Sequence, residues 1–211
     1  MKKLRSFLLL LPVLASLQGC VEMAAVGAGA AALGYEDRRT TGTMVEDEGI
    51  ELRATNRVSE RFGDRVHVNI TSFNRSVLIT GEVPNANTRS EIEKIVQGVP
   101  SVRSITNELQ VAGGTSLSSR ATDSTITGKV KARFVDSGKF SALHVKVVTE
   151  AAVVYLLGIV TEGEANEAVE IARTTGGVRK VVKVFEYCKP TDAVCARGGQ
   201  PKAGEAKKSG S

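Results

Sequence analysis

Four residues near the start of the chain, Leu17-Gln18-Gly19-Cys20, place a small residue and a thiol at the end of an apolar segment. The segment opens with the basic stretch Met1 to Arg5 and continues with a mostly apolar run from Ser6 to Leu17. That run is well short of the roughly 20 residues that cross a bilayer core. A positive start, a short apolar run and a small residue at its end are typical of a secretory signal. We therefore predict that residues 1–19 are a signal peptide.

The same four residues resemble a bacterial lipobox, whose cysteine becomes the acylated N-terminus of the mature protein. Gln18 departs from the Ala or Ser that is more usual at its position, and an ordinary signal with a chance cysteine is the alternative. Two or three acyl chains would hold Cys20 at a membrane essentially permanently. Val21 stands where lipoproteins kept at the inner membrane carry Asp. The resemblance therefore implies a lipid-anchored protein on the periplasmic side of the outer membrane.

Composition limits the classes of protein that the chain could belong to. Its 211 residues are 42% apolar, which suits one large domain or two small ones. Lys2, Lys3 and Arg5 carry three of the five net positive charges and leave with the signal, so the remainder carries +2. This charge is too small for general binding to nucleic acid. Trp is absent, which argues against a large aromatic-lined pocket, and we expect no cofactor.

Cys188 and Cys195 are the two cysteines left over once Cys20 carries lipid. In an oxidising compartment, such a pair separated by six residues could close a small disulfide loop. A metal site is the less favoured alternative, because neither histidine lies nearby in the sequence. We expect a disulfide, followed by a disordered basic tail to Ser211.

The rest of the chain contains an internal repeat, which indicates a duplicated domain. Corresponding stretches follow one another in the same order and at nearly the same offset. They are Val66–Ile70 with Leu143–Val147, Val77–Gly81 with Val154–Gly158, and Val102–Ile105 with Val178–Val181.

Each copy has the periodicities of an αββαβ unit. Apolar residues four apart, such as Ile50 and Ala54 or Ile126 and Val130, predict a first helix with one buried stripe. An alternating strand with one face inward, a second apolar strand, a second helix and a closing strand follow. We predict an α+β fold with two tandem units, each a three-stranded mixed sheet packed on two helices. The expected boundaries are a flexible stalk over 20–45, domains over 46–112 and 123–187, a linker over 113–122, and a loop and tail over 188–211.

Two αββαβ copies, each with a glycine ending its second strand, resemble BON domains. A lipobox followed by two such copies is similar to the dual BON-domain outer-membrane lipoproteins, a phospholipid-binding family linked to division and envelope stress. One feature departs from this pattern. Glu150-Ala151-Ala152 lacks the usual Asn-Gly between the first two strands of the second copy, which leaves the type of hairpin turn open.

The residue types most often found in catalytic sites occur here without a catalytic arrangement. His67 and His144 sit at equivalent positions of the repeat, and strand alternation predicts that both face solvent. No nucleophile elbow, phosphate-binding loop or helical His-Glu pair occurs in the sequence. We therefore predict no catalytic or metal-binding residue and no enzyme. Gly81 and Gly158 are interpreted as structural, allowing a strand exit or close packing, with a functional role only through a domain interface.

The first helices of the two copies differ in charge. The first is acidic, with Glu46, Asp47 and Glu48, whereas the second carries Lys129 and Lys131. Each exposed Lys or Arg near an anionic bilayer contributes about 1 kcal/mol of attraction. On a helical wheel, the apolar residues at 126, 130 and 134 face the core. This leaves a strip of small and apolar residues beside lysines, which suits shallow insertion among headgroups.

An ordinary solvated helix surface is the alternative interpretation of this strip. In the resembled family, however, the second domain reads anionic phospholipid through this helix. The resemblance therefore implies phosphatidylglycerol or cardiolipin as ligands, although Thr125 stands where an aromatic residue would help to anchor the interface. The residues implied are Thr125, Gly128, Lys129, Lys131, Ala132, Arg133 and Val135.

These observations together predict a non-catalytic outer-membrane lipoprotein that binds anionic phospholipid and supports envelope integrity. The alternative is an adaptor that docks onto outer-membrane assembly or division proteins, favoured by the acidic first helix. A peptidoglycan-binding or hydrolytic role has no support in the sequence beyond the compartment.

Overall fold

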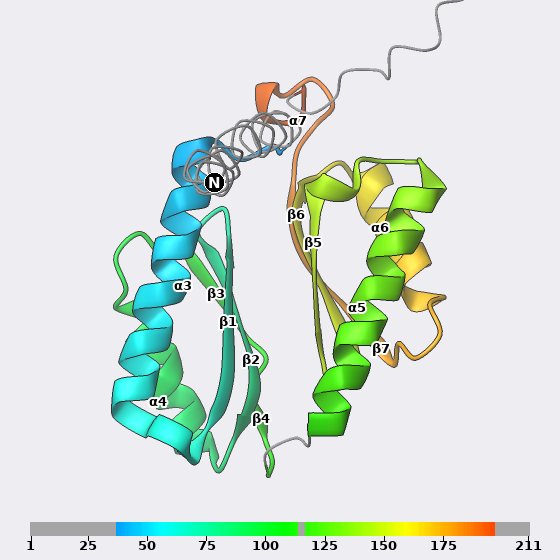
Figure 1. Cartoon of the computed structure of the whole chain (residues 1–211). Helices are drawn as coiled ribbons and strands as arrows, with labels where there is room; N and C mark the ends of the chain where they lie inside the picture. Colours follow the sequence, from blue (N-terminus) through cyan, green and yellow to red (C-terminus); the bar gives the residue numbers. More distant parts are fainter. Residues whose placement is uncertain (1–36, 114–116, 197–211) are drawn as a thin grey trace, which may run out of the picture. The chain divides into compact units, whose positions relative to one another are not determined.

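The computed structural model describes residues 37–113 and 117–196, which all belong to one compact unit. The signal segment, Cys20, most of the stalk and the tail after residue 196 lie outside the described residues. Figure 1 shows two similar copies of one fold, each with two long helices on one face of a sheet.

The first copy contains a four-stranded mixed sheet covered by α3 and α4. Strand β1 pairs antiparallel with β2, and β3 and β4 both pair parallel with β2. The third strand is split in two where Leu109 turns into the core and is 2% exposed. The elements are α3 (Thr41–Phe62), η2 (Gly63–Arg65), β1 (His67–Phe73), β2 (Ser76–Val83), α4 (Ala86–Gln97), β3 (Ser104–Asn107) and β4 (Gln110–Val111).

The second copy repeats this topology with an unbroken third strand, in the order β5-β6-β7. Strand β5 pairs antiparallel and β7 parallel with β6. A capping box between Thr161 and Glu164 begins the second helix of this copy. The elements are α5 (Leu117–Ser137), η3 (Ala142–His144), β5 (Val145–Glu150), β6 (Val153–Val160), α6 (Glu162–Arg173), β7 (Lys180–Tyr187) and α7 (Ala193–Ala196).

The helices bury the stripes that the periodicity predicted. Ile50 and Ala54 of α3 are fully buried, as are Val130 and Phe134 of α5. Each stripe packs on its own sheet and forms a separate core cluster. The predicted α+β class, with tandem αββαβ copies and mixed sheets, is confirmed.

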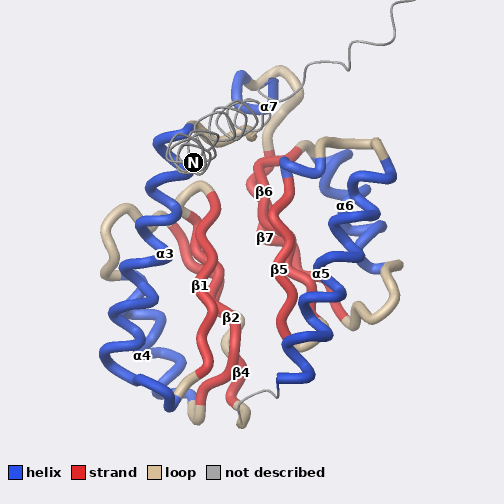
Figure 2. The backbone as a smooth tube through the Cα atoms, in the orientation of Figure 1, coloured by secondary structure: helices blue, strands red, loops and turns tan. Residues whose placement is uncertain are grey.

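A third apolar cluster joins the other faces of the two sheets. Phe73 and Leu78 of the first copy pack with Tyr155, Leu157 and Ile159 of β6. Every residue of β6 is buried, so this strand is covered on both faces. This explains its continuous apolar run, which differs from the alternation of a half-exposed strand. Figure 2 shows the two long helices of each copy on one side of its strands, which leaves the other side of the sheet open to this packing.

The first helix of each copy begins a few residues before the domain boundary expected from the sequence. Helix α3 begins at Thr41, capped by the Thr40 hydroxyl, within the expected stalk over 20–45. Helix α5 begins at Leu117, inside the expected linker over 113–122. Strands β2 and β6 continue two residues beyond Gly81 and Gly158. The residues that begin both helices carry no regular apolar stripe, which is why periodicity did not reveal them.

The end of the second copy is closed by a disulfide between Cys188 and Cys195, whose Cα atoms lie 6.0 Å apart. Cys195 is 4% exposed, and Cys188 packs against the cluster between the sheets. The disulfide therefore holds the short helix α7 beside β6.

Candidate functional site

The exposed side of α5 carries most of the predicted lipid-binding residues. We define the outer face of α5 as Thr125, Gly128, Lys129, Lys131, Ala132 and Val135, all of which are exposed. Val135 is 68% exposed, the largest fraction among the exposed large apolar side chains of the described residues. A Cβ added to Gly128 would meet nothing within 4 Å, so internal packing does not require a glycine there. The outer face is therefore open to a partner along about three helical turns.

The two lysines of this face are available to an external partner. Within the described residues, the ammonium groups of Lys129 and Lys131 form no ion pair or hydrogen bond. Lys139, just beyond the helix, instead pairs with Glu167 at 2.6 Å. One acid, Asp136, is exposed next to Val135 and opposes the positive charge. The face thus combines an exposed apolar side chain with two available cations.

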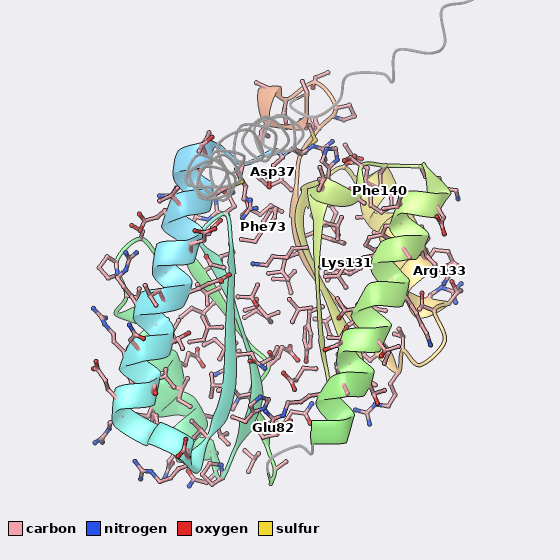
Figure 3. The ribbon with its side chains drawn as sticks, viewed as in Figure 1. Asp37, Phe73, Glu82, Lys131, Arg133 and Phe140 are labelled. Atoms are coloured by element: carbon pink, nitrogen blue, oxygen red, sulfur yellow. A yellow bond between two sulfur atoms is a disulfide. The ribbon has the colours of Figure 1, made fainter. Side chains whose placement is uncertain are left out.

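Arg133, which was predicted together with these residues, lies apart from them in the structure. Its guanidinium donates hydrogen bonds of 2.7 Å to the Ile171 carbonyl and to the Thr175 hydroxyl, at the C-terminal end of α6. A third bond of 3.1 Å reaches the Thr174 hydroxyl. Figure 3 shows Arg133 pointing away from the side of α5 that packs on β5. A cation at a helix C-terminus stabilises the helix dipole, so Arg133 has a structural role.

Arg57 plays the same part in the first copy. It lies 76 positions before Arg133, the offset that separates Ile50 from Ile126, and it donates a 2.7 Å bond to the Gly98 carbonyl at the end of α4. The duplicated contact confirms that this arginine serves the fold of each copy.

Two acidic side chains of α3 also make contacts within the protein. Asp47 is 2% exposed and accepts hydrogen bonds from the Asn74 and Arg75 backbone N–H groups at 2.8 and 2.7 Å. Glu51 accepts from the Ser72 N–H and pairs with Lys146 of the second copy at 2.9 Å. These contacts account for acidic residues that the sequence alone left without a purpose.

Asp123 is the counterpart of Asp47 in the second copy, and sequence reasoning missed both roles. It accepts bonds from the Ala151 and Ala152 backbone N–H groups at 2.9 and 2.8 Å. Both alanines have positive φ, 49° and 60°, as a type I′ turn requires. This settles the turn that the sequence left open. The constant offset of 76 between the two aspartates was a signal that could have revealed the pair.

The two histidines are not both solvent-facing, which corrects the prediction made from alternation. His144 is 3% exposed and lies in η3, before the strand begins. Its Nδ1 lies 3.1 Å from the Glu164 carboxylate, which also receives two bonds from Arg38. His67 is partly buried and lies 2.8 Å from Glu82.

Glu164 is the centre of this buried group. Burial would raise the pKa of Glu164, but hydrogen bonds from His144 and Arg38 outweigh it and hold the pKa well below the usual range. Arg38, which precedes α3, also donates to the Ile159 carbonyl at 2.8 Å. Arg38 therefore connects the segment before the first copy to the second copy.

Gly81 and Gly158 permit a close approach between neighbouring strands. A Cβ at either position would collide with a backbone carbonyl, that of His67 or of His144. Gly81 also has a φ of 116°. Both positions serve the pairing of the first two strands in each copy.

No helix within residues 37–113 and 117–196 combines the length and apolarity needed to cross a bilayer. Comparison with known proteins places the two copies in one family. The BON domain model matches residues 50–113 and 122–189. The chain belongs to the BON-domain family.

Similar proteins narrow this assignment. The chain is 38% identical over 186 residues to the outer membrane lipoprotein DolP of Haemophilus influenzae, a match that covers 87% of this chain and 96% of that protein. It is 31% identical over 153 residues to a 21 kDa hemolysin of Actinobacillus pleuropneumoniae, covering 72% and 79% of the two chains. The chain is thus a DolP-like, dual BON-domain lipoprotein of the outer membrane. Neither BON-domain nor DolP-like proteins are families of enzymes.

Among solved structures, a match is found with CdsD, a structural protein of the type III secretion system of Chlamydia trachomatis. It covers 69% of this chain and 92% of that one, at 15% identity and a TM-score of 0.29. A likeness at this level says nothing about the function of the present chain.

Proposed function

We propose that the protein is anchored by acylated Cys20 to the periplasmic side of the outer membrane and binds anionic phospholipid through the outer face of α5. Phosphatidylglycerol and cardiolipin are the ligands that this surface suits. The observation that carries the proposal is an exposed Val135 one helical turn from Lys131, with Lys129 further along the same face, where neither lysine pairs with any residue that the structure describes. Through this contact the protein would support the integrity of the outer membrane.

The affinity of such a surface for lipid would be low without an anchor. Two lysines supply about 2 kcal/mol of attraction to an anionic bilayer, and small side chains such as Gly128 and Ala132 allow only shallow insertion. Acylation raises the effective concentration of bilayer around the site, so that a weak contact suffices. Because Thr125 provides no aromatic anchor, charge carries most of the interaction.

The proposal is tested by sedimentation of the compact unit Asp37–Ser211 with phosphatidylglycerol vesicles. Lys129→Glu with Lys131→Glu should weaken binding about thirtyfold or more, because about 2 kcal/mol of attraction is lost. Lys180→Glu with Lys183→Glu is the matched control, since these exposed lysines of β7 change the net charge equally. Equal loss from both pairs, or from neither, would contradict a site on α5.

Two further arms sharpen this experiment. Arg133→Gln should lower the melting temperature while leaving vesicle binding of the folded protein unchanged, because Arg133 caps α6. Raising the salt concentration should weaken binding steeply, since exposed charges are screened. Vesicles of neutral phosphatidylcholine should not sediment the protein.

The adaptor function remains a second candidate because α3 exposes two large apolar side chains. Val45 and Leu52 are each 64% exposed and lie seven residues apart, on one side of the helix. An outer-membrane assembly or division protein could dock there. Photo-crosslinking in intact cells from position 52 should then give a discrete protein adduct, whereas position 135 should give adducts with lipid.

A further inference from the structure

Three potential metal ligands from the two copies meet between the sheets, away from the outer face of α5. His67 and Glu82 come from the first copy and Glu150 from the second. Each offers one ligand atom, and the three atoms lie within 4.8 Å of one another. Because the group contains an imidazole, it is more than a cluster of acids on a surface.

Regular structure holds each of these side chains in place. His67 and Glu82 are directly opposite each other in the β1–β2 register, and His67 Nδ1 lies 2.8 Å from a Glu82 carboxylate oxygen. Glu150 is the last residue of β5, before the turn that Asp123 binds. The Asn69 side-chain amide donates a 2.7 Å bond to Glu150 and orients its carboxylate. The site is therefore built from three strands and a supporting hydrogen bond.

The two carboxylates are buried although they repel each other. Glu82 is 5% exposed and Glu150 is 7% exposed. A cation between the carboxylates would remove the repulsion.

We propose that His67, Glu82 and Glu150 bind a divalent transition-metal ion, Zn²⁺ in the first instance, that bridges the two copies. One imidazole nitrogen and two carboxylate oxygens are a donor set suited to Zn²⁺ or Mn²⁺. Bonds of about 2.0–2.2 Å would place the donor atoms roughly 3–4 Å apart, a small contraction of the present group. The ion replaces the hydrogen bond between His67 and Glu82, and water completes its coordination.

An entry path adjoins the site. His67 and Glu82 line a cavity of about 640 Å³, open to solvent. Arg65 and Arg120 line the same cavity and compete with a metal ion for its negative charge. Replacing one of these arginines should strengthen metal binding, whereas replacing a ligand should weaken it. The two kinds of variant therefore have opposite effects on metal affinity.

The experiment uses the full chain in a non-ionic detergent, freed of metal with a chelator and titrated with ZnCl₂, MnCl₂ or CoCl₂. One ion per chain should bind, Co²⁺ should develop a visible absorption spectrum, and the melting temperature should rise by several degrees because only the folded state binds. Glu150→Gln should weaken binding at least tenfold and abolish the rise. Absence of binding in the unaltered chain overturns the proposal.

Control variants separate this site from binding elsewhere. Glu186→Gln alters another carboxylate between the copies, which binds Asn74 and Arg103 instead, and it should bind metal as the unaltered chain does. Arg120→Gln should bind metal at least as tightly. Should Glu150→Gln fail to fold, His67→Gln provides the same test from the first copy. Metal binding unchanged in His67→Gln or in folded Glu150→Gln overturns the proposal.

Discussion

Asp47 and Asp123 bind the hairpin turns of their two copies in the same way. Each is a buried carboxylate of the first helix that accepts hydrogen bonds from the two central backbone N–H groups of the turn. Two successive N–H groups that point at one carboxylate form strong, charge-assisted bonds. The relationship fixes the helix to the far end of its sheet in both copies.

Replacing Asp123 should therefore destabilise the second copy. Asp123→Ala removes two charge-assisted bonds and leaves both turn N–H groups without that acceptor, which costs about 3 kcal/mol. Urea unfolding, followed by circular dichroism, measures the loss. Asp136→Ala, at an exposed acid of the same helix, should change stability by no more than about 0.5 kcal/mol. A loss of similar size in both variants would show that the turn contacts do not matter.

The turn itself predicts a stabilising substitution. Ala152 has a φ of 60°, a conformation that costs an L-residue roughly 1–2 kcal/mol and costs glycine little. Ala152→Gly should raise the free energy of unfolding by about 1 kcal/mol, because the N–H bond to Asp123 is kept. Ala132→Gly, on the exposed face of α5, should lower it by roughly the same amount. Thermal melts of the two variants should thus shift in opposite directions.

Sequence patterns predicted those parts of the fold in which burial repeats at a regular spacing. The stripe of α5 through Ile126 and Phe134 is such a case. The exposed side of α5 followed from the same periodicity, because the residues opposite a buried stripe must face outward.

The contacts between the copies could not be predicted in this way. Arg38 and Glu164 are 126 residues apart, and no local pattern relates them. His144 was misplaced because alternation extended β5 by two residues into η3, where a side chain no longer alternates between faces. The role of Arg133 was missed because a surface arginine and a helix-capping arginine look alike in a sequence.

The Glu164 carboxylate should make the free energy of unfolding depend on pH in the acidic range. Its pKa is held below the usual value of about 4.3 in the folded state, so its contribution is fully present above that value and is lost as the pH falls further. Glu164→Gln should cost about 3 kcal/mol at pH 7, since it leaves Arg38 buried without its carboxylate. The difference from the unaltered chain should shrink as the pH falls below about 4. Melting temperatures between pH 7 and pH 3 test this, and a constant difference would contradict it.

Asp136 offers a way to strengthen the proposed lipid contact instead of removing it. This acid is exposed beside Val135, on the side of α5 that would approach an anionic bilayer. Asp136→Asn removes a repulsion worth about 1 kcal/mol, so binding to phosphatidylglycerol vesicles should rise about fivefold. Glu48→Gln changes the net charge equally from an exposed position of α3, which carries no proposed lipid site, and should have a much smaller effect. The two variants change the net charge equally. Stronger vesicle binding by Asp136→Asn alone would therefore identify α5 as the surface that meets the membrane. Equal gains in binding by both variants would mean that vesicle binding depends only on overall charge.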